Sequence, residues 1–344
     1  MKKKISLTDI AGSLNVSRTL VSMVLNGQGD LHGISAATQA KVKAKAKELN
    51  YKPNSIARGL RTGKSNTIGL IVTDISNSFY AKIARRIEYR ASLFGYNLIF
   101  CSSDESVERE EALIQMLRGR QVDGLIMATT FKDDSVLSEL INEEYPFVLI
   151  DRIISGFNSN YVVVDNYNSS MLAVERLIGN GHEQIGLLTV SPSHLSTIRD
   201  REQGYIDALK KHDLEITETN ICEIPFNDIY NQVGFELDRL LRGSSPVTAL
   251  YATNNNIAKA CLEHLADMNL TIPNDVALLS YDDIDVFKFC NPPLTAVAQP
   301  IREISDHALD ILLELITTGT QKQGEEKKII LSANMVVRKS CTRF

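Results

Sequence analysis

The side chains most often used in catalysis and metal binding are present in this sequence, but their spacing matches no catalytic or metal site. The six histidines lack the spacing of zinc ligands, and no Gly-x-Ser-x-Gly segment of a hydrolase occurs. The group Asp282, Asp283 and Asp285 has neither a calcium-loop pattern nor a histidine partner. Gly59–Ser65 nearly spells a phosphate-binding loop, but its first glycine falls one residue too close and a helical segment precedes it. The sequence therefore predicts no enzyme, no metal site and no cofactor.

The distribution of charge indicates a different chemistry. Residues 1–64 contain 12 Lys and Arg side chains against 3 Asp and Glu, a net charge of +9, whereas the rest of the chain carries −14. A basic segment joined to an acidic body predicts that the first part contacts a polyanion and the second does not. A solvated lysine-rich helix would explain Lys41 to Lys47 alone, so this alternative stays open until the local pattern is considered.

The predicted secondary structure divides the chain into two regions. The 344 residues suggest two or three domains at roughly 150 residues each. Up to about residue 62 the pattern is short helices, and from Thr67 onward apolar β-rich runs alternate with amphipathic helical stretches. The predicted strands are 67–73, 97–101, 122–127, 147–151, 184–190, 248–252, 276–280, 294–298, 328–331 and 335–337, and the predicted helices between them are 79–94, 107–119, 134–142, 200–211 and 254–268.

Strands that are apolar throughout and separated by helices predict parallel sheets covered on both faces. So many βα units favour two successive doubly wound lobes over a single sheet. A β/α barrel is less favoured, because the late strands are short and do not complete eight even repeats. The predicted fold class is thus α/β, preceded by an all-α segment, and the cleft between the lobes is the expected ligand site.

The first helices have the signals of a helix-turn-helix. Ser6 can cap a helix with Asp9 as its capping-box partner, and Asn15 tolerates the left-handed turn that follows. Ser17 can cap a second helix, whose apolar arc is Leu20, Val21, Val24 and Leu25 and whose opposite arc is Arg18, Thr19, Ser22 and Met23. A third helix is predicted from Ser35 to about Leu49, with Ala37, Val42, Ala46 and Leu49 inward. An ordinary three-helix bundle would share this pattern, but the basic exposed arc and flanks favour phosphate contact.

Residues 51–64 could form only a marginal helix. Asn54 is a good cap, but Gly59 weakens the helix, and isolated helices this short are unstable in water. We expect this segment to order only against DNA or a second copy of itself.

Segments along most of the chain resemble a known protein family. Leu7–Ala11, Val16–Gly27 and Asn50–Asn54 resemble the amino-terminal headpiece of the lactose-repressor (LacI/GalR) family. The similarity continues into a body that resembles periplasmic sugar-binding proteins. It is carried there by Phe79, Val163–Asn166, Gly181-His182, Arg201-Glu202-x-Gly204-Tyr205, Tyr281–Asp283 and Pro293–Thr295.

The resemblance implies a set of DNA-binding residues. Arg18 and Thr19 would read base edges, although Arg18 could instead contact only phosphate. Met23 departs from the arginine usual in the family, and Leu60 matches a hinge leucine that wedges into the minor groove, unless it is simply buried in the linker. The full predicted set is Ser6, Ser17, Arg18, Thr19, Ser22, Met23, Asn26, Tyr51, Asn54, Ala57 and Leu60.

The resemblance also implies an effector site made by Asp151, Arg201, Asn254 and Asp282, with Thr73, Phe79 and Tyr80 beside it. Two carboxylates, a guanidinium and an amide suit a ligand that carries many hydroxyl groups. Asp151 and Asp282 could alternatively cap helices or pair with arginines such as Arg152. Asn255 stands where the family commonly has aspartate, and the spacing does not decide between Phe226 and Tyr230 as a ring-stacking residue.

The sequence is therefore identified as a member of this family, with a headpiece at 1–53, a hinge helix and linker at 54–64, and a two-lobed effector-binding and dimerisation domain at 65–344. The predicted function is a homodimeric transcriptional repressor on a pseudo-palindromic operator, controlled by a small molecule, expected to be a carbohydrate. A cytoplasmic location is expected, because no apolar segment follows Met1–Lys4 and the five cysteines show no pairing pattern. The alternatives are a solute-binding receptor without a DNA role and a sugar- or nucleotide-processing enzyme.

Overall fold

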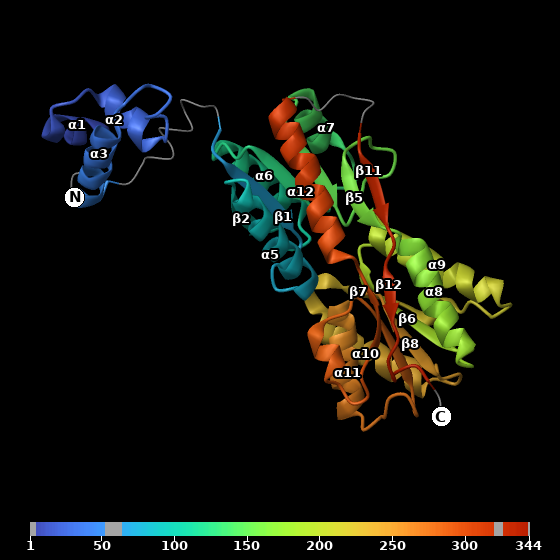
Figure 1. Cartoon of the computed structure of the whole chain (residues 1–344). Helices are drawn as coiled ribbons and strands as arrows, with labels where there is room; N and C mark the ends of the chain where they lie inside the picture. The colour runs from blue at the N-terminus through green and yellow to red at the C-terminus, as the bar shows by residue number, and fades with distance from the viewer. Residues whose placement is uncertain (1–4, 52–63, 320–325, 343–344) are drawn as a thin grey trace. The chain divides into compact units, whose positions relative to one another are not determined.

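The chain forms two compact units, Met1–Ser65 and Asn66–Phe344. A computed structural model describes residues 5–51, 64–319 and 326–342 of them (Figure 1). The predicted hinge at 54–64 lies outside the described residues except for Lys64. The boundaries of the headpiece, the hinge and the body therefore stay a prediction.

The first unit is a bundle of three helices around a small apolar core. Ser6 and Asp9 form the predicted capping box, Asn15 takes the left-handed conformation at φ 52°, and the Ser17 hydroxyl accepts a hydrogen bond from the Leu20 amide. The core is built from Ile10, Ala11, Val21, Val24, Val42 and Ala46. The helices are α1 (Leu7–Leu14), α2 (Arg18–Leu25) and α3 (Ala36–Glu48).

One inward-facing residue of the third helix is predicted wrongly. Ala37 is exposed, and Gln39 is buried in its place. The Gln39 amide donates hydrogen bonds to the Asp30 carboxylate at 2.7 Å and to the Ile34 carbonyl at 2.9 Å. A polar residue therefore faces inward because it fixes the loop between α2 and α3, which an apolar pattern does not reveal.

The first lobe of the larger unit is a sheet of six parallel strands in the order β11-β5-β4-β3-β1-β2. Its core strands are apolar along their whole length, as expected for a sheet covered on both faces. Its elements are β1 (Thr67–Val72), α5 (Ser78–Leu93), β2 (Asn97–Ser102), α6 (Val107–Gly119), β3 (Gly124–Met127), α7 (Ser135–Asn142), β4 (Phe147–Ile150), β5 (Tyr161–Val164), α12 (Ile301–Thr318) and β11 (Lys328–Leu331).

The second lobe repeats this plan with the strand order β12-β10-β9-β8-β6-β7, in which only β12 runs antiparallel to its neighbour. Its elements are α8 (Asn166–Gly179), β6 (Ile185–Ser191), α9 (Ser196–Lys211), the short 3-10 helix Glu218–Asn220, β7 (Ile221–Pro225), the 3-10 helix Phe226–Asp228, α10 (Ile229–Arg242), β8 (Ala249–Ala252), α11 (Asn255–Asp267), β9 (Ala277–Tyr281), the 3-10 helix Asp285–Lys288, β10 (Thr295–Ala298) and β12 (Asn334–Val336).

The chain passes between the lobes three times, after β5, after β10 and after β11 (Figure 1). The second crossing returns α12 to the first lobe, where it packs against α5 and the strands β3, β4 and β5. Bidentate hydrogen bonds from Arg86 to Asp306 join α5 to α12. The predicted α/β class with two doubly wound lobes is confirmed, and a β/α barrel is excluded.

Candidate functional site

The first candidate surface is the exposed side of α2. Its first residues, Arg18 and Thr19, are exposed, while Ser22 and Met23 are half-buried. At the end of the helix, the exposed Asn26 side chain donates a hydrogen bond to the Ser22 hydroxyl at 3.2 Å. A short helix whose first turn projects polar and cationic side chains has the form required of a helix that reads a DNA groove.

The other predicted DNA-binding residues lie in different surroundings, and three of them are outside the described residues. Ser6 and Ser17 are exposed at the starts of α1 and α2, where their side chains cap helices. Tyr51 is half-buried and packs against the headpiece core. Asn54, Ala57 and Leu60 lie outside the described residues.

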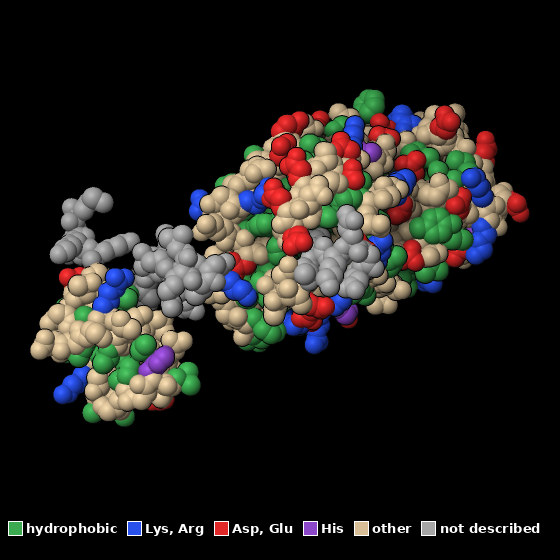
Figure 2. Space-filling model, turned by 90° about the horizontal axis from the view of Figure 1, so that it is seen from above, with side chains coloured by type: hydrophobic (Ala, Val, Ile, Leu, Met, Phe, Trp, Pro, Cys, Tyr) green, Lys and Arg blue, Asp and Glu red, His purple; other side chains and the backbone are tan. Residues whose placement is uncertain are grey.

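Most of the basic side chains of the described headpiece are exposed. Lys41, Lys43 and Lys47 are exposed on α3, whereas Lys45 forms an ion pair of 2.7 Å with Glu48. The larger unit differs, since its visible face shows many Asp and Glu side chains among fewer basic ones (Figure 2). The net positive charge that attracts a polyanion lies in residues 1–64, because the rest of the chain carries −14.

The second candidate site is the cleft between the two lobes of the larger unit. The cavity that its residues line has a volume of about 50 Å³, measured as the space open to the centres of water-sized molecules. All seven predicted effector-binding residues contribute to this lining, and all but Asn254 are at least nine-tenths buried. The carboxyl ends of parallel strands meet at one edge of each sheet, so residues that follow β1, β4, β8 and β9 converge there.

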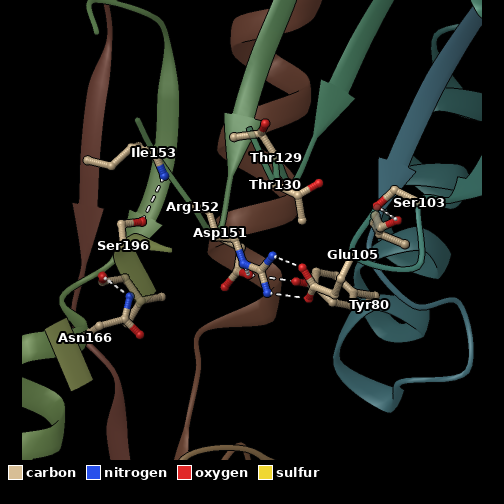
Figure 3. A network of polar contacts seen from close by, with 12 residues as sticks. Tyr80, Ser103, Glu105, Thr129, Thr130, Asp151, Arg152, Ile153, Asn166 and Ser196 are labelled. Atoms are coloured by element: carbon tan, nitrogen blue, oxygen red, sulfur yellow. Dashed lines mark hydrogen bonds and ion pairs between the residues drawn. The ribbon is translucent and has the colours of Figure 1, made fainter. Parts of the chain in front are cut away.

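One wall of the cleft is a chain of buried polar contacts on the first lobe (Figure 3). The Tyr80 hydroxyl donates a hydrogen bond to the Asp151 carboxylate at 2.7 Å. Arg152 donates two hydrogen bonds to Glu105, at 2.6 and 2.7 Å, and its Nε lies 3.6 Å from Asp151. Burial lowers the pKa of Arg152, but the acidic groups around it together raise that pKa by more, so the guanidinium stays charged. Asp151 is thereby held in place by groups on both sides.

The opposite wall is organised around Arg201 on α9. Its guanidinium lies over the Tyr281 ring, 3.7 Å from the ring centroid, and donates to the Asn166 side chain and the Thr253 carbonyl, each at 2.8 Å. These contacts fix the plane of the guanidinium, and a planar donor held in this way can span two ligand oxygens.

Asp282 follows β9 and is held in a left-handed conformation at φ 69°. The Gln299 amide donates a hydrogen bond to one of its oxygens at 2.6 Å. Burial raises the pKa of Asp282 to about 6, against the lowering effects of Arg201 and Gln299. The second carboxylate oxygen is the one through which Asp282 could accept a hydrogen bond from a ligand hydroxyl.

The remaining predicted residues have mixed roles. The Asn254 Oδ1 caps α11 by accepting a hydrogen bond from the Ile257 amide at 2.8 Å, and Asn254 also lines the cleft. Phe79 and Tyr80 pack edge to face with ring centroids 5.0 Å apart, and Thr73 is buried beside them. Phe226 lines the cleft, whereas Tyr230 stacks on His264 with centroids 4.3 Å apart.

The comparisons with known proteins agree with this geometry. Residues 6–54 match the profile of the lacI family of bacterial regulatory proteins, and residues 174–341 match a periplasmic-binding-protein-like domain. The chain is 32% identical to a probable HTH-type transcriptional regulator, EndR, from Paenibacillus polymyxa, over 94% of each protein. The chain belongs to the LacI family.

Solved structures of LacI-family proteins share the whole fold. The structure of the lac repressor dimer bound to operator and an anti-inducer has a TM-score of 0.84 at 25% identity, and it covers 99% of this chain and 100% of that one. The complex of the regulator CelR with cellobiose has a TM-score of 0.70 at 28% identity, over 98% and 100% of the two chains. The LacI-family chain is thus a DNA-binding transcriptional regulator, as predicted, and neither a solute-binding receptor nor an enzyme.

Several cleft residues of this LacI-family chain are absent from the predicted site. Glu105, Arg152 and Gln299 all line the cleft, and each holds a predicted residue or its neighbour in place. Glu105 follows β2 at the same edge of the sheet as Asp151, which is a signal that the sequence contains. Gln299 lies at a crossing between the lobes, and nothing in the local sequence pattern indicates its contact with Asp282.

Proposed function

We propose that the protein is a homodimeric repressor whose affinity for its operator is set by a neutral, hydroxyl-rich small molecule bound in the cleft. The observation that carries this proposal is the cleft itself, where Asp151, Asp282 and Arg201 are buried, oriented by their own partners, and face one cavity. Fixed carboxylate acceptors and a fixed guanidinium donor in one cavity match the alternating hydroxyl groups of a sugar.

The charge of the cleft favours a neutral ligand over an anionic one. Three carboxylates, from Glu105, Asp151 and Asp282, line it together with two guanidinium groups, from Arg152 and Arg201. The lining is net negative when all five are ionised, so a phosphorylated or carboxylated ligand would be repelled. The similarity to CelR, whose solved structure is a complex with cellobiose, supports a carbohydrate as the ligand class.

On the DNA, we propose that Arg18 and Thr19 contact base edges, with Ser17, Ser22 and Asn26 close to phosphates and Met23 against a thymine methyl group. Ser6 and Tyr51 would contact the backbone, and Asn54, Ala57 and Leu60 would belong to the minor-groove hinge. This assignment is supported by the exposure of α2 and by the operator-bound lac repressor dimer, to which the whole chain is similar.

A second copy of the chain would cover apolar side chains that the larger unit leaves exposed. Tyr89 and Leu93 lie one helical turn apart on α5 and are 50% and 66% exposed, and Phe94 follows at 54%. Val286 and Phe289 on the second lobe are 50% and 83% exposed. An apolar surface of this kind marks an interface. A dimer requires two half-sites about one turn of DNA apart.

The proposal places the protein in the cytoplasm, together with the chromosome. All five cysteines are unpaired, which suits a reducing compartment. Among the described residues, no helix has both the length and the apolar character needed to cross a membrane.

The experiment is a thermal-shift screen of neutral mono- and disaccharides against phosphorylated sugars and nucleobases, followed by gel-shift assays with each hit. A ligand that binds only the folded protein raises its melting temperature by mass action. We expect neutral sugars to give the thermal shift, Arg201→Lys to reduce that shift, and Arg18→Ala to weaken operator binding while leaving the shift unchanged. A shift from phosphorylated sugars alone would overturn the ligand class, and operator binding unaffected by Arg18→Ala would overturn the assignment of α2.

A further inference from the structure

Four polar contacts cross the cleft between the lobes of the larger unit, among the residues that the structure describes. They join Asn77 to Asn255, Lys82 to Asp285, the Ile153 amide to the Ser196 hydroxyl, and the Thr130 carbonyl to His194. The Lys82 and Asp285 side chains are 38% and 69% exposed, so their ion pair contributes little. The Asn77–Asn255 contact differs from the other three because it joins two side chains and one of them is almost fully buried, with Asn255 only 1% exposed.

Because Asn77 caps α5 through its side-chain oxygen, the same oxygen is the atom that faces Asn255. The Asn77 Oδ1 accepts a hydrogen bond from the Phe79 amide at 3.0 Å, which caps α5. The same oxygen lies 2.9 Å from Asn255 Nδ2. Because the atom that Asn77 presents is already an acceptor, its partner must be a donor. Asn255 can supply that donor, whereas an ionised aspartate at this position cannot.

Asn255 gains this hydrogen bond only when the lobes are in contact. It is the first residue of α11, directly after the cap Asn254, and therefore moves with the second lobe. Its Oδ1 is buried and accepts no hydrogen bond from any described residue. In an open cleft, water would reach both ends of the amide. The hydrogen bond to Asn77 is therefore available to Asn255 only in the closed arrangement.

We infer that Asn77 and Asn255 form a latch that sets the balance between the open and closed arrangements of the two lobes. Asn255 is a positioning residue in this latch. It acts through Asn77 at the start of α5, whose next turn carries Phe79 and Tyr80 into the cleft. Aspartate at position 255 would place a carboxylate against the Asn77 oxygen and favour the open arrangement, so asparagine there biases this chain toward closure.

Two substitutions of equal size test the latch in opposite directions. Asn255→Asp removes the donor, and we expect the ratio of closed to open protein to fall about two- to tenfold, the usual effect of one net hydrogen bond. Asn77→Asp keeps a good cap for α5 and offers a carboxylate to the Asn255 amide, so we expect that ratio to rise. The double variant places two carboxylates together and should be the most open of all.

The measurement is the distance between the lobes in the full-length, ligand-free protein, by pulsed electron paramagnetic resonance. Spin labels are attached through non-natural amino acids at exposed positions, Gln115 on α6 and Asp238 on α10, so the five cysteines stay unmodified. Lys82→Ala is the matched control that breaks the exposed contact, and far-UV circular dichroism verifies folding. The inference is overturned if Asn255→Asp and the double variant give the same distance distribution as the parent, or if Asn77→Asp opens the cleft as Asn255→Asp does.

Discussion

The buried ion pair between Glu105 and Arg152 offers the sharpest test of how the cleft is built. Their side chains are 7% and 9% exposed and are joined by two hydrogen bonds of 2.6 and 2.7 Å. Replacing Arg152 with Met preserves much of the length of the side chain but leaves Glu105 without its guanidinium partner. We expect Arg152→Met to lower the free energy of unfolding by about 3–5 kcal/mol, the usual cost of breaking a buried pair from one side.

Glu105→Gln leaves Arg152 with one neutral acceptor and with Asp151 at 3.6 Å, so we expect a smaller loss of about 2 kcal/mol. The double variant Arg152→Met/Glu105→Gln removes both charges. It should lose clearly less than the sum of the two single changes, with a coupling of about 1–3 kcal/mol. A domain is stable by only about 5–15 kcal/mol in total, so these changes are large enough to measure.

The assay is urea unfolding followed by far-UV circular dichroism, since the chain contains no tryptophan for fluorescence. Lys327→Met is the matched control. Lys327 forms an ion pair with Glu314 at 2.5 Å, but the two side chains are 48% and 54% exposed, so the loss should be at most about 1 kcal/mol. If Arg152→Met cost no more than Lys327→Met, or if the two single losses simply added in the double variant, the argument for a charged, preorganised wall would be wrong.

Two further predictions concern pH and helix packing. Burial raises the pKa of Asp282 from its ordinary 3.8 to about 6, so the folded protein binds this proton more tightly than the unfolded chain. Its ionisation therefore lowers stability as pH rises from about 4 to about 6, by about 3 kcal/mol in all. Asp282→Asn should stabilise the protein by up to this amount at pH 8 and by almost nothing near pH 4, in unfolding measured across that range; an equal effect at both pH values would contradict the assigned cause. Gly204→Ala should cost about 1–3 kcal/mol, because its Cβ would lie 2.4 Å from the Tyr167 carbonyl oxygen where α9 meets α8. Gly179→Ala, with nothing within 4 Å of its Cβ, is the control and should be neutral or slightly stabilising; equal melting temperatures for the two variants would contradict the prediction.

Local sequence patterns predicted the strands that form the middle of each sheet, but they missed several elements. β1, β3, β8 and β9 are mostly apolar and almost fully buried because helices cover both faces, and such runs are easily recognised. The predicted alternation leaves out β5, β7, α8, α10 and α12. β7 is an edge strand that alternates buried and exposed positions, so it lacks the continuous apolar run by which the other strands are recognised. β5 is as short and as apolar as the predicted strands β3 and β8, and nothing in its own sequence accounts for its omission.

The candidate site was predictable to a similar extent. The rule that strand ends meet at one edge brings Asp151, Asn254 and Asp282 together, and the structure places them around one cavity. Their partners were not predictable, because those depend on contacts between distant parts of the chain. Gln299 reaches Asp282 because the chain leaves β10 there to return to the first lobe. α9 begins at Ser196 rather than at 200, and the Ser196 hydroxyl accepts a hydrogen bond from the Ile153 amide across the cleft.

The position of α5 links the cleft to the proposed dimer surface. Its first turn carries Phe79 and Tyr80, which line the cleft. Its later turns carry the exposed side chains Tyr89 and Leu93, which we propose a second copy covers. The helix is joined to α12, because Arg86 binds Asp306 through two hydrogen bonds and the two helices pack against each other. A ligand that contacts Tyr80, as we propose, therefore acts on the same helix that carries part of the proposed dimer surface. Small shifts at a packed interface select between discrete arrangements, so we propose that α5 couples ligand binding to the dimer surface.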